Sequence, residues 1–233
     1  MKVLAIVDGP VERRLVTAIA GAVAEVMGVE VETLRLQQRL DDIAGAIGQP
    51  DVVAAVLGFQ PHRANESSGD DLALELCTIV DKPVVLVPPK APAISRLRRV
   101  LVPMEGDPDT AATMRNTIRL ARDVDLEIVV LHVRDAPSLP MFEDQPQHET
   151  DAWAQEFLAR YVSVPAAAVR LELRVGMPHE QIPAAAAELE ADLVALGWLQ
   201  DSSPGHAKVV RAALERCPTP VLLVPLVGRL ARV

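Results

Sequence analysis

Residues 100–107, Val-Leu-Val-Pro-Met-Glu-Gly-Asp, repeat the pattern of residues 3–10, Val-Leu-Ala-Ile-Val-Asp-Gly-Pro. Residues 219–225, Thr-Pro-Val-Leu-Leu-Val-Pro, repeat residues 82–88, Lys-Pro-Val-Val-Leu-Val-Pro, in the same way. The two halves of the chain therefore open and close alike. The markers are about 40 residues further apart in the second half, which is room for one more helix and strand with their loops. The first half is predicted to be an abbreviated copy of the second.

Short runs rich in valine, leucine and isoleucine alternate with longer stretches of helical period in both halves. Unbroken apolar strands separated by helices are typical of a parallel sheet that is covered on both faces. The strand runs are 3–7, 29–36, 51–57 and 83–87 in the first half, with helices near 11–27, 38–48 and 70–80, and 100–104, 126–133, 169–175, 192–196 and 220–224 in the second.

These patterns predict an α/β protein of two tandem, Rossmann-like parallel-sheet domains. The segment 89–98 contains two prolines and a basic cluster between strands of different repeats, so we place a linker at 91–98, between domains at 1–90 and 99–228. Each half ends in an apolar strand that would otherwise be an open sheet edge. We therefore expect the halves to pack as a pseudo-dimer within one chain, and a further homodimer is left open.

Composition excludes several classes of protein. The 233 residues are 50% hydrophobic with a net charge of −9, and only 3% are aromatic, so neither a basic surface nor a base-stacking surface for nucleic acid is expected. The apolar run at the N-terminus is too short for a signal peptide or membrane span. Two cysteines, Cys77 and Cys217, are too few for a disulfide framework. We expect a cytoplasmic protein that binds neither nucleic acid nor membrane.

The segment from Arg134 to Thr150 has three prolines, several acids and no apolar period, and is predicted to be an exposed loop. The helix that follows carries Trp153, Phe157 and Tyr161 at a spacing of four, which favours a stripe facing the core over a cofactor site. His132 lies in an apolar strand and is predicted to be a core histidine. The five histidines show no metal-ligand spacing, so no metal site is expected.

Five segments of the second half, in order and at matching intervals, resemble the universal stress protein family in its tandem form. They are Arg99-Val-Leu-Val-Pro-Met-Glu-Gly, Leu131-His132-Val133, Val175-Gly176-Met-Pro, Ala191-Asp192-Leu-Val-Ala-Leu-Gly197 and Cys217-Pro-Thr-Pro-Val-Leu-Leu-Val-Pro225. The resemblance implies a five-stranded parallel sheet with helices on both faces. Adenine nucleotides, in members that bind them, sit at the carboxyl ends of the strands.

In nucleotide-binding members an acidic residue ends the first strand, and a loop reading Gly-x2-Gly-x9-Gly-Ser/Thr holds the phosphates. Gly197 matches the first glycine, but Gln200 stands at the second, Ala207-Lys208 stands at the last pair, and the loop is about three residues shorter. Glu105 replaces the usual aspartate. The resemblance therefore implies a degenerate pocket whose candidate binding residues are Glu105, Val133, Gly197, Gly205 and Lys208.

Ser203 and Pro204 suit the cap and first position of a helix, and Lys208 could reach a phosphate from its first turn, although a solvated lysine is the simpler reading. The first half keeps Asp8 and Gly58. Its corresponding loop has Pro61 at the second glycine, and Ser68 and Asp71 form a capping-box pattern. Because Asp70 and Asp71 occupy the helix start and repel phosphate, we expect no phosphate site in the first half.

No Walker loop, dinucleotide fingerprint or nucleophile elbow occurs, and no catalytic residue is assigned. The preferred function is a non-catalytic binding or regulatory module of the universal stress type, with unknown protein partners and at most weak binding of ATP or AMP. One alternative is an ATP- or AMP-binding stress switch or weak ATPase that uses the second-half pocket. Another is a structural interaction protein.

Overall fold

The computed structural model describes residues 1–7, 10–35, 39–60, 72–124, 126–134, 146–162, 169–203 and 207–226. Strands and helices alternate along both halves, as the sequence pattern predicts. The first half contains β1 (Lys2–Val7), α1 (Pro10–Met27), β2 (Glu30–Arg35), α2 (Leu40–Ile47), β3 (Val52–Gly58), α3 (Leu72–Ile79) and β4 (Val84–Val87). The second contains β5 (Arg99–Pro103), α4 (Pro108–Asp123), β6 (Glu127–Arg134), α5 (Pro146–Phe157), the π-helical turn η2 (Leu158–Val162), β7 (Val169–Val175), α6 (Pro178–Glu188), β8 (Leu193–Trp198), α7 (Lys208–Arg216) and β9 (Val221–Pro225).

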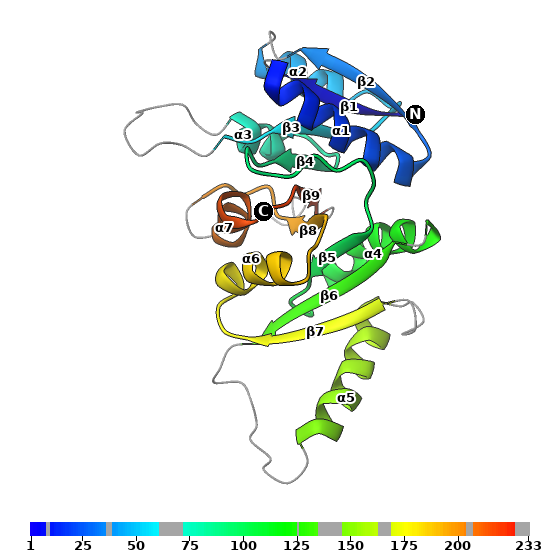
Figure 1. Cartoon of the computed structure of the whole chain (residues 1–233), viewed down its shortest axis with the longest axis vertical. Coiled ribbons are helices and arrows are strands. Elements are labelled where there is room, and N and C mark those ends of the chain that lie inside the picture. Colours follow the sequence, from blue (N-terminus) through cyan, green and yellow to red (C-terminus); the bar gives the residue numbers. More distant parts are fainter. Residues whose placement is uncertain are drawn as a thin grey trace.

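The described strands form one nine-stranded sheet that runs the length of the molecule in the order β2-β1-β3-β4-β9-β8-β5-β6-β7 (Figure 1). Neighbouring strands are parallel within each half. At the junction β4 and β9 are antiparallel, with Val85 opposite Leu222. The predicted pairing of the two closing strands is confirmed, and each of them covers an edge that its partner would otherwise leave open.

The abbreviation of the first half falls at the edge of the sheet. In the second half β7 pairs along the whole outer side of β6. β2, which corresponds to β6 in the first half, is the terminal strand among the described residues. The missing unit is therefore the counterpart of α5 and β7, and its loss leaves the four strands next to the junction intact.

Two apolar cores lie on opposite faces of the sheet. The first is formed with α1, α4 and η2, and the second with α2, α3, α6 and α7. Because both faces are covered, central strands such as Val3–Val7 are buried at every position. The segment 91–98 also contributes to the first core, through Ala91 and Leu97.

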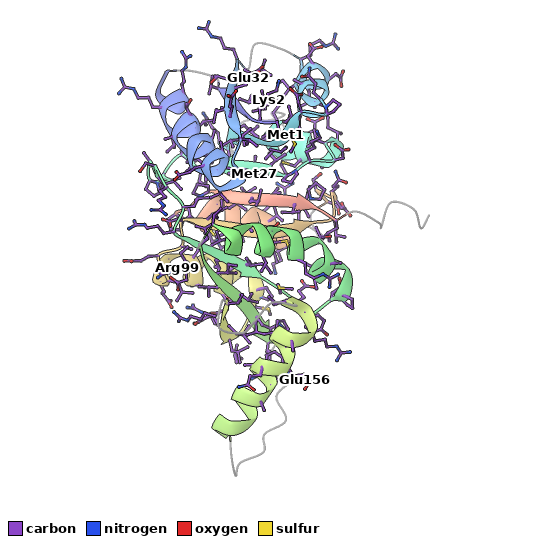
Figure 2. All side chains as sticks on the ribbon, turned by 90° about the vertical axis from the view of Figure 1, so that its right-hand side faces the viewer. Met1, Lys2, Met27, Glu32, Arg99 and Glu156 are labelled. Atoms are coloured by element: carbon purple, nitrogen blue, oxygen red, sulfur yellow. The ribbon has the colours of Figure 1, made fainter. Side chains whose placement is uncertain are left out.

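The outer strand β2 is polar, as an edge strand should be. Lys2 of β1 crosses to it and pairs with Glu32 at 2.9 Å and with Asp51 at 3.0 Å (Figure 2). Hydrogen bonds to Glu32 and Asp51 raise the pKa of the Lys2 ammonium. Because the two carboxylates are exposed to solvent, these ion pairs are expected to contribute little to the free energy of unfolding.

Two expectations from the sequence are corrected. The loop expected to reach Thr150 ends earlier, because α5 begins at Pro146, a residue whose fixed φ suits the first helical position. His132 is half-buried rather than a core residue, and its Nδ1 bonds to the carbonyl oxygen of Met104 at 2.8 Å. Cys77 and Cys217 are buried and form no disulfide, and burial raises the pKa of the Cys217 thiol to about 12.

The aromatic stripe behaves as predicted. Phe157 is buried in the first core, and Trp153 and Tyr161 pack against that core. No helix in the described part of the chain combines the length and apolar character that crossing a membrane requires.

Candidate functional site

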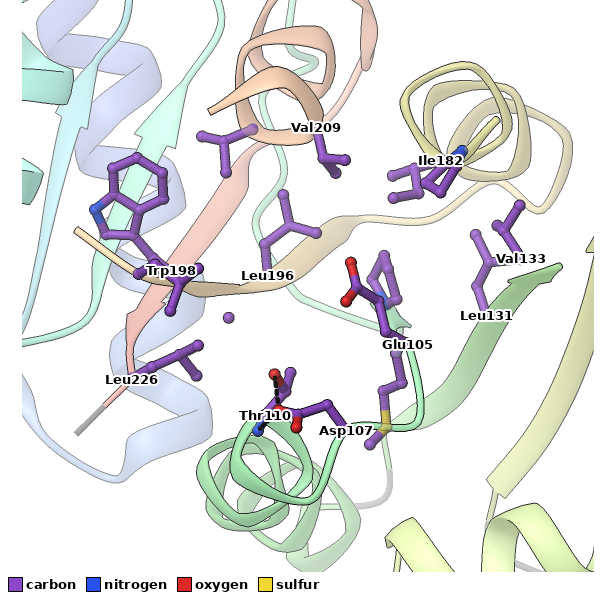
Figure 3. A pocket seen from close by; sticks show the side chains of 16 residues that line it. Glu105, Asp107, Thr110, Leu131, Val133, Ile182, Leu196, Trp198, Val209 and Leu226 are labelled. Carbon is purple, nitrogen blue, oxygen red and sulfur yellow. Dashed lines mark hydrogen bonds between the residues drawn. The ribbon is translucent and has the colours of Figure 1, made fainter. Parts of the chain in front are cut away.

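A cavity of about 410 Å³ opens in the second half, at the carboxyl ends of β5, β6 and β8 (Figure 3). Parallel strands deliver their following loops to this one edge, and this is where doubly wound sheets place ligands. The walls combine strand ends with the first turns of three helices. They comprise Pro103, Met104, Glu105, Asp107, Thr110, Leu131, Val133, Pro178, Ile182, Leu196, Gly197, Trp198, Leu199, Val209, Val210 and Leu226.

The loop after β5 supplies the acidic side of the cavity. Met104 extends the pairing beyond Pro103, because its N–H donates to the Leu131 carbonyl at 2.8 Å. Glu105 follows on the exposed rim. Asp107 then caps α4: its carboxylate accepts from both the backbone N–H and the hydroxyl of Thr110, each at 3.0 Å. Two carboxylates therefore face the cavity from one short loop.

Gly197 allows the opposite wall to close up. A Cβ at this position would lie 3.1 Å from a methyl of Leu226 and 3.2 Å from the methyl of Thr110. Both contacts are tighter than ordinary van der Waals packing, so a side chain here would crowd Leu226 and Thr110, which would each have to give way by a few tenths of an ångström. The residue that resembles the first glycine of the signature thus has a packing role in this cavity.

Of the five candidate binding residues, Glu105, Val133 and Gly197 are brought together in the cavity wall. Lys208 is the first residue of α7, and its side chain is exposed and outside the lining, which Val209 and Val210 provide instead. Gly205 lies outside the described residues, as do Asp8, Pro61, Ser68, Asp70 and Asp71. The described lining contains two acids and no lysine or arginine.

The expected cap at Ser203 is not formed. α7 begins at Lys208, and Ala207 precedes it without a side-chain cap. Ser203 instead belongs to a separate turn: its N–H donates to the Asp201 carboxylate at 2.9 Å, and its carbonyl accepts from Ala207 at 3.0 Å. Asp201 and Ser203 therefore form an Asx-type turn ahead of α7.

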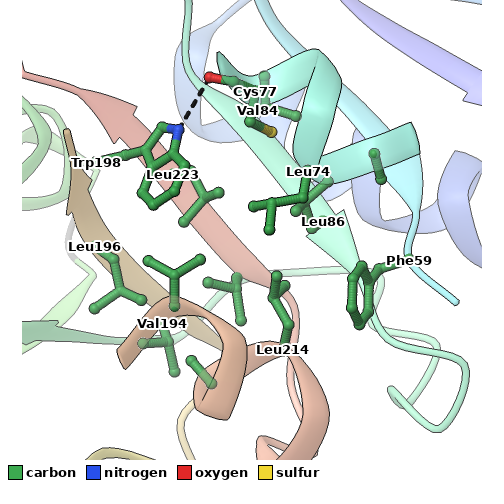
Figure 4. Close-up of a cluster of buried hydrophobic side chains, with 14 of the residues drawn as sticks. Phe59, Leu74, Cys77, Val84, Leu86, Val194, Leu196, Trp198, Leu214 and Leu223 are labelled. Atoms are coloured by element: carbon green, nitrogen blue, oxygen red, sulfur yellow. Dashed lines mark hydrogen bonds between the residues drawn. The ribbon is translucent and has the colours of Figure 1, made fainter. Parts of the chain in front are cut away.

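Gln200 and Trp198 direct their N–H groups toward the first half, although Trp198 also lines the cavity. The Trp198 indole N–H donates to the Cys77 carbonyl at 3.0 Å (Figure 4). The Gln200 amide donates to the Val80 carbonyl at 2.7 Å. These carbonyls belong to the last turn of α3 and to the residue just after it, where helix carbonyls lack intrahelical partners. The loop after β8 therefore caps a helix of the other half.

Sequence reasoning missed Asp107, Thr110, Trp198 and Leu226. The pattern Asp-Pro-x-Thr at 107–110 is a helix-start signal and could have identified Asp107. Leu226 has no comparable signal. It reaches the cavity because its N–H donates to the Trp198 carbonyl at 2.9 Å, which extends the pairing of β8 and β9 by one residue.

The fold and cavity together define a tandem, doubly wound α/β protein with a ligand-sized cavity in its second half. The model of the universal stress protein family matches residues 96–225, more than half of the chain. The chain therefore belongs to the universal stress protein family. Among curated proteins, none matches the sequence significantly.

Two solved structures extend the similarity over both halves. A universal stress protein from Archaeoglobus fulgidus DSM 4304 is 16% identical, with a TM-score of 0.58 over 87% of this chain and 71% of that one. A functionally unknown protein from Pseudomonas aeruginosa PAO1 is 13% identical, with a TM-score of 0.59 over 97% of this chain and 92% of that one. At these identities the likeness shows the tandem fold alone.

Proposed function

We propose that this chain is a non-catalytic, ligand-binding regulatory module whose second-half cavity prefers an uncharged nucleoside to its phosphorylated forms. The observation that carries the proposal is the charge of the cavity wall: Glu105 and Asp107 face it, and no described lysine or arginine lines it. A volume of about 410 Å³ is in the range of small-molecule sites.

Electrostatics gives the order of affinities. Each added phosphate brings negative charge toward a wall that already carries two carboxylates, and like charges repel. The helix start that could offset this repulsion, at α7, provides backbone amides and the exposed Lys208. Adenosine should consequently bind at least as tightly as AMP, and ATP most weakly.

The absence of turnover is supported by the side chains that line the cavity. The described lining has no histidine, cysteine, serine or lysine, and its Thr110 hydroxyl is held by Asp107, so the carboxylates of Glu105 and Asp107 are the groups there that could act as a base. We expect phosphate release from ATP to stay at the rate of a protein-free control.

Titration calorimetry with adenosine, AMP and Mg·ATP tests the proposal. We expect the affinity to fall in that order. A ligand at one hundred times its Kd would add about 2.7 kcal/mol to the free energy of unfolding, and weakly bound ATP at millimolar concentration should add much less, so the shift in melting temperature should be small. Gly197→Ala should weaken adenosine binding by crowding Thr110 and Leu226 in the cavity wall, whereas Gly21→Ala, at a helical site with nothing within 4 Å of the new Cβ, should not. Tighter binding of ATP than of adenosine would contradict the proposal.

Lys208→Ala provides a second discrimination. It should leave adenosine binding unchanged and weaken any ATP binding on the order of tenfold, as expected for one charge-assisted contact. Asp8→Ala, in the first half, should change neither. Equal weakening of ATP binding by both variants would show that the ligand site has been assigned to the wrong half.

A further inference from the structure

A second hollow of about 300 Å³ lies beside the same end of β6 but on the other face of the sheet. Successive strand residues point to opposite faces, so Leu131 and Val133 line the first cavity while His132 faces the second. The second hollow is bounded by Glu105, Gly106, His132, Trp153, Glu156, Phe157, Arg160 and Tyr161. Glu105, at the rim between the two, is the one described residue that this hollow shares with the cavity of the proposed function.

Aromatic rings form its wall. His132 lies 5.1 Å from Trp153 and 4.8 Å from Phe157 between ring centroids, and Phe157 lies 4.9 Å from Tyr161. The π-helical turn η2 follows Phe157 directly and contains Tyr161. π-Helical turns are rare in proteins, and those that occur often lie at functional sites.

Gly106 keeps the hollow open at its base. Its φ is +87°, and a Cβ there would lie 3.2 Å from Phe157 and 3.5 Å from Tyr161. Any side chain would strain the backbone and press on these rings. A bare backbone therefore lies against the ring edges at this point.

The free polar groups of the hollow are mainly acceptors. Because a carbonyl can only accept, the bond from His132 to Met104 places a proton on Nδ1 and leaves the Nε2 lone pair available in the neutral ring. Within the described residues, the carboxylates of Glu105 and Glu156 make no ion pair or hydrogen bond; Glu156 lies on α5 (Figure 2). Two guanidinium groups already lie against the rings: Arg160, in the lining, is 5.7 Å from the centre of the Tyr161 ring, and Arg134, beside the lining, is 5.2 Å from the centre of the Trp153 ring.

We infer that this hollow binds a small planar nitrogen cation, an amidinium or guanidinium compound. Its flat face stacks on the aromatic wall, and its N–H groups donate to the carboxylates and to Nε2 of His132. The position of Arg160 shows that a planar cation already fits against Tyr161, and the exposed Arg160 side chain is free to yield that place to a ligand.

Benzamidine and benzamide, which share a shape but differ in charge, test the inference on the full-length protein by calorimetry. We expect benzamidine to bind about tenfold more tightly than benzamide. Equal affinities, or no binding of benzamidine, would overturn the inference. Saturating adenosine is included as a separate arm, so failure of this site is distinguishable from failure of the proposed function.

Two variants should shift benzamidine affinity in opposite directions. Glu156→Gln should weaken it about threefold, because one carboxylate is lost, and Arg160→Ala should strengthen it, because the competing guanidinium is removed. Glu25→Gln, an exposed change of the same type on α1, is the matched control and should have no effect. If Arg160→Ala weakened binding, Arg160 would be a ligand-binding group and the cation assignment would be wrong.

Discussion

Gln200 has one role by resemblance to the family and another in the structure. By resemblance it is a lost glycine of a phosphate loop. In the structure its φ is +59°, a left-handed conformation that glycine adopts freely, and its amide bonds to Val80 of the other half. A left-handed backbone therefore occurs here without glycine, and the side chain joins the two halves.

Substitutions at Gln200 separate these two properties. Gln200→Ala loses the hydrogen bond and keeps the strained φ, so it should lower the free energy of unfolding by about 1–2 kcal/mol. Gln200→Gly loses the same bond but relieves the φ, so its loss should be smaller by several tenths of a kcal/mol or more. Urea unfolding of the three proteins measures the order, and an alanine variant as stable as the native chain would show that the contact contributes nothing.

Among the elements, the first turn of α4 links stability to ligand choice. Asp107 satisfies the Thr110 N–H at the start of this helix and also places a charge in the cavity wall. Asp107 therefore both caps the start of α4 and contributes to the negative charge of the cavity wall.

Asp107→Asn and Asp107→Ala distinguish the two roles. Asparagine caps as well as aspartate, so Asp107→Asn should keep stability within about 0.5 kcal/mol while narrowing the affinity gap between adenosine and ATP. Asp107→Ala should narrow the same gap and cost about 1 kcal/mol of unfolding free energy. Urea unfolding and calorimetry of both variants provide the two readings; an unchanged affinity gap in both would remove Asp107 from the electrostatic argument.

For the whole molecule, the β4–β9 junction makes one sheet of two halves. The register pairs Val84 with Leu223, Val85 with Leu222 and Leu86 with Val221. Since Val85 and Leu222 occupy equivalent places in the repeated closing strands, an approximate two-fold axis passes through this pair. Trp198 and Gln200 add hydrogen bonds on one side of the axis.

This symmetry predicts how the second half behaves alone. A chain of residues 91–233 exposes β9 and should dimerise through it, with Leu222 opposite its own copy. Light scattering should therefore give a dimer, and Leu222→Cys in this fragment should form an intermolecular disulfide. The same substitution in the full chain should not, because Val85 occupies that place. A monomeric fragment would mean that the junction depends on features of the first half.

Much of the fold was predictable from local pattern. Unbroken apolar runs marked the strands, the repeated Pro-Val-Val-Leu-Val-Pro and Pro-Val-Leu-Leu-Val-Pro segments marked the junction, and helix α1 lies within one residue of its expected start. The misses are at helix starts. α5 begins at Pro146, inside a segment that was expected to be a loop, and α7 begins at Lys208 rather than at the expected Pro204.

By itself the sequence determined the strand and helix order, the two-fold repeat and the fact that the first half lacks one unit, because these depend on periodicities a few residues long and on copies of one pattern. It also identified Glu105, Val133 and Gly197 as neighbours, through resemblance. Only the tertiary structure decided that Lys208 lies outside the cavity wall, that Leu226 and Asp107 line it, and that Gln200 bonds to Val80. Such contacts join residues up to about 120 positions apart. They depend on strand order and on the direction each side chain takes, which no local pattern contains.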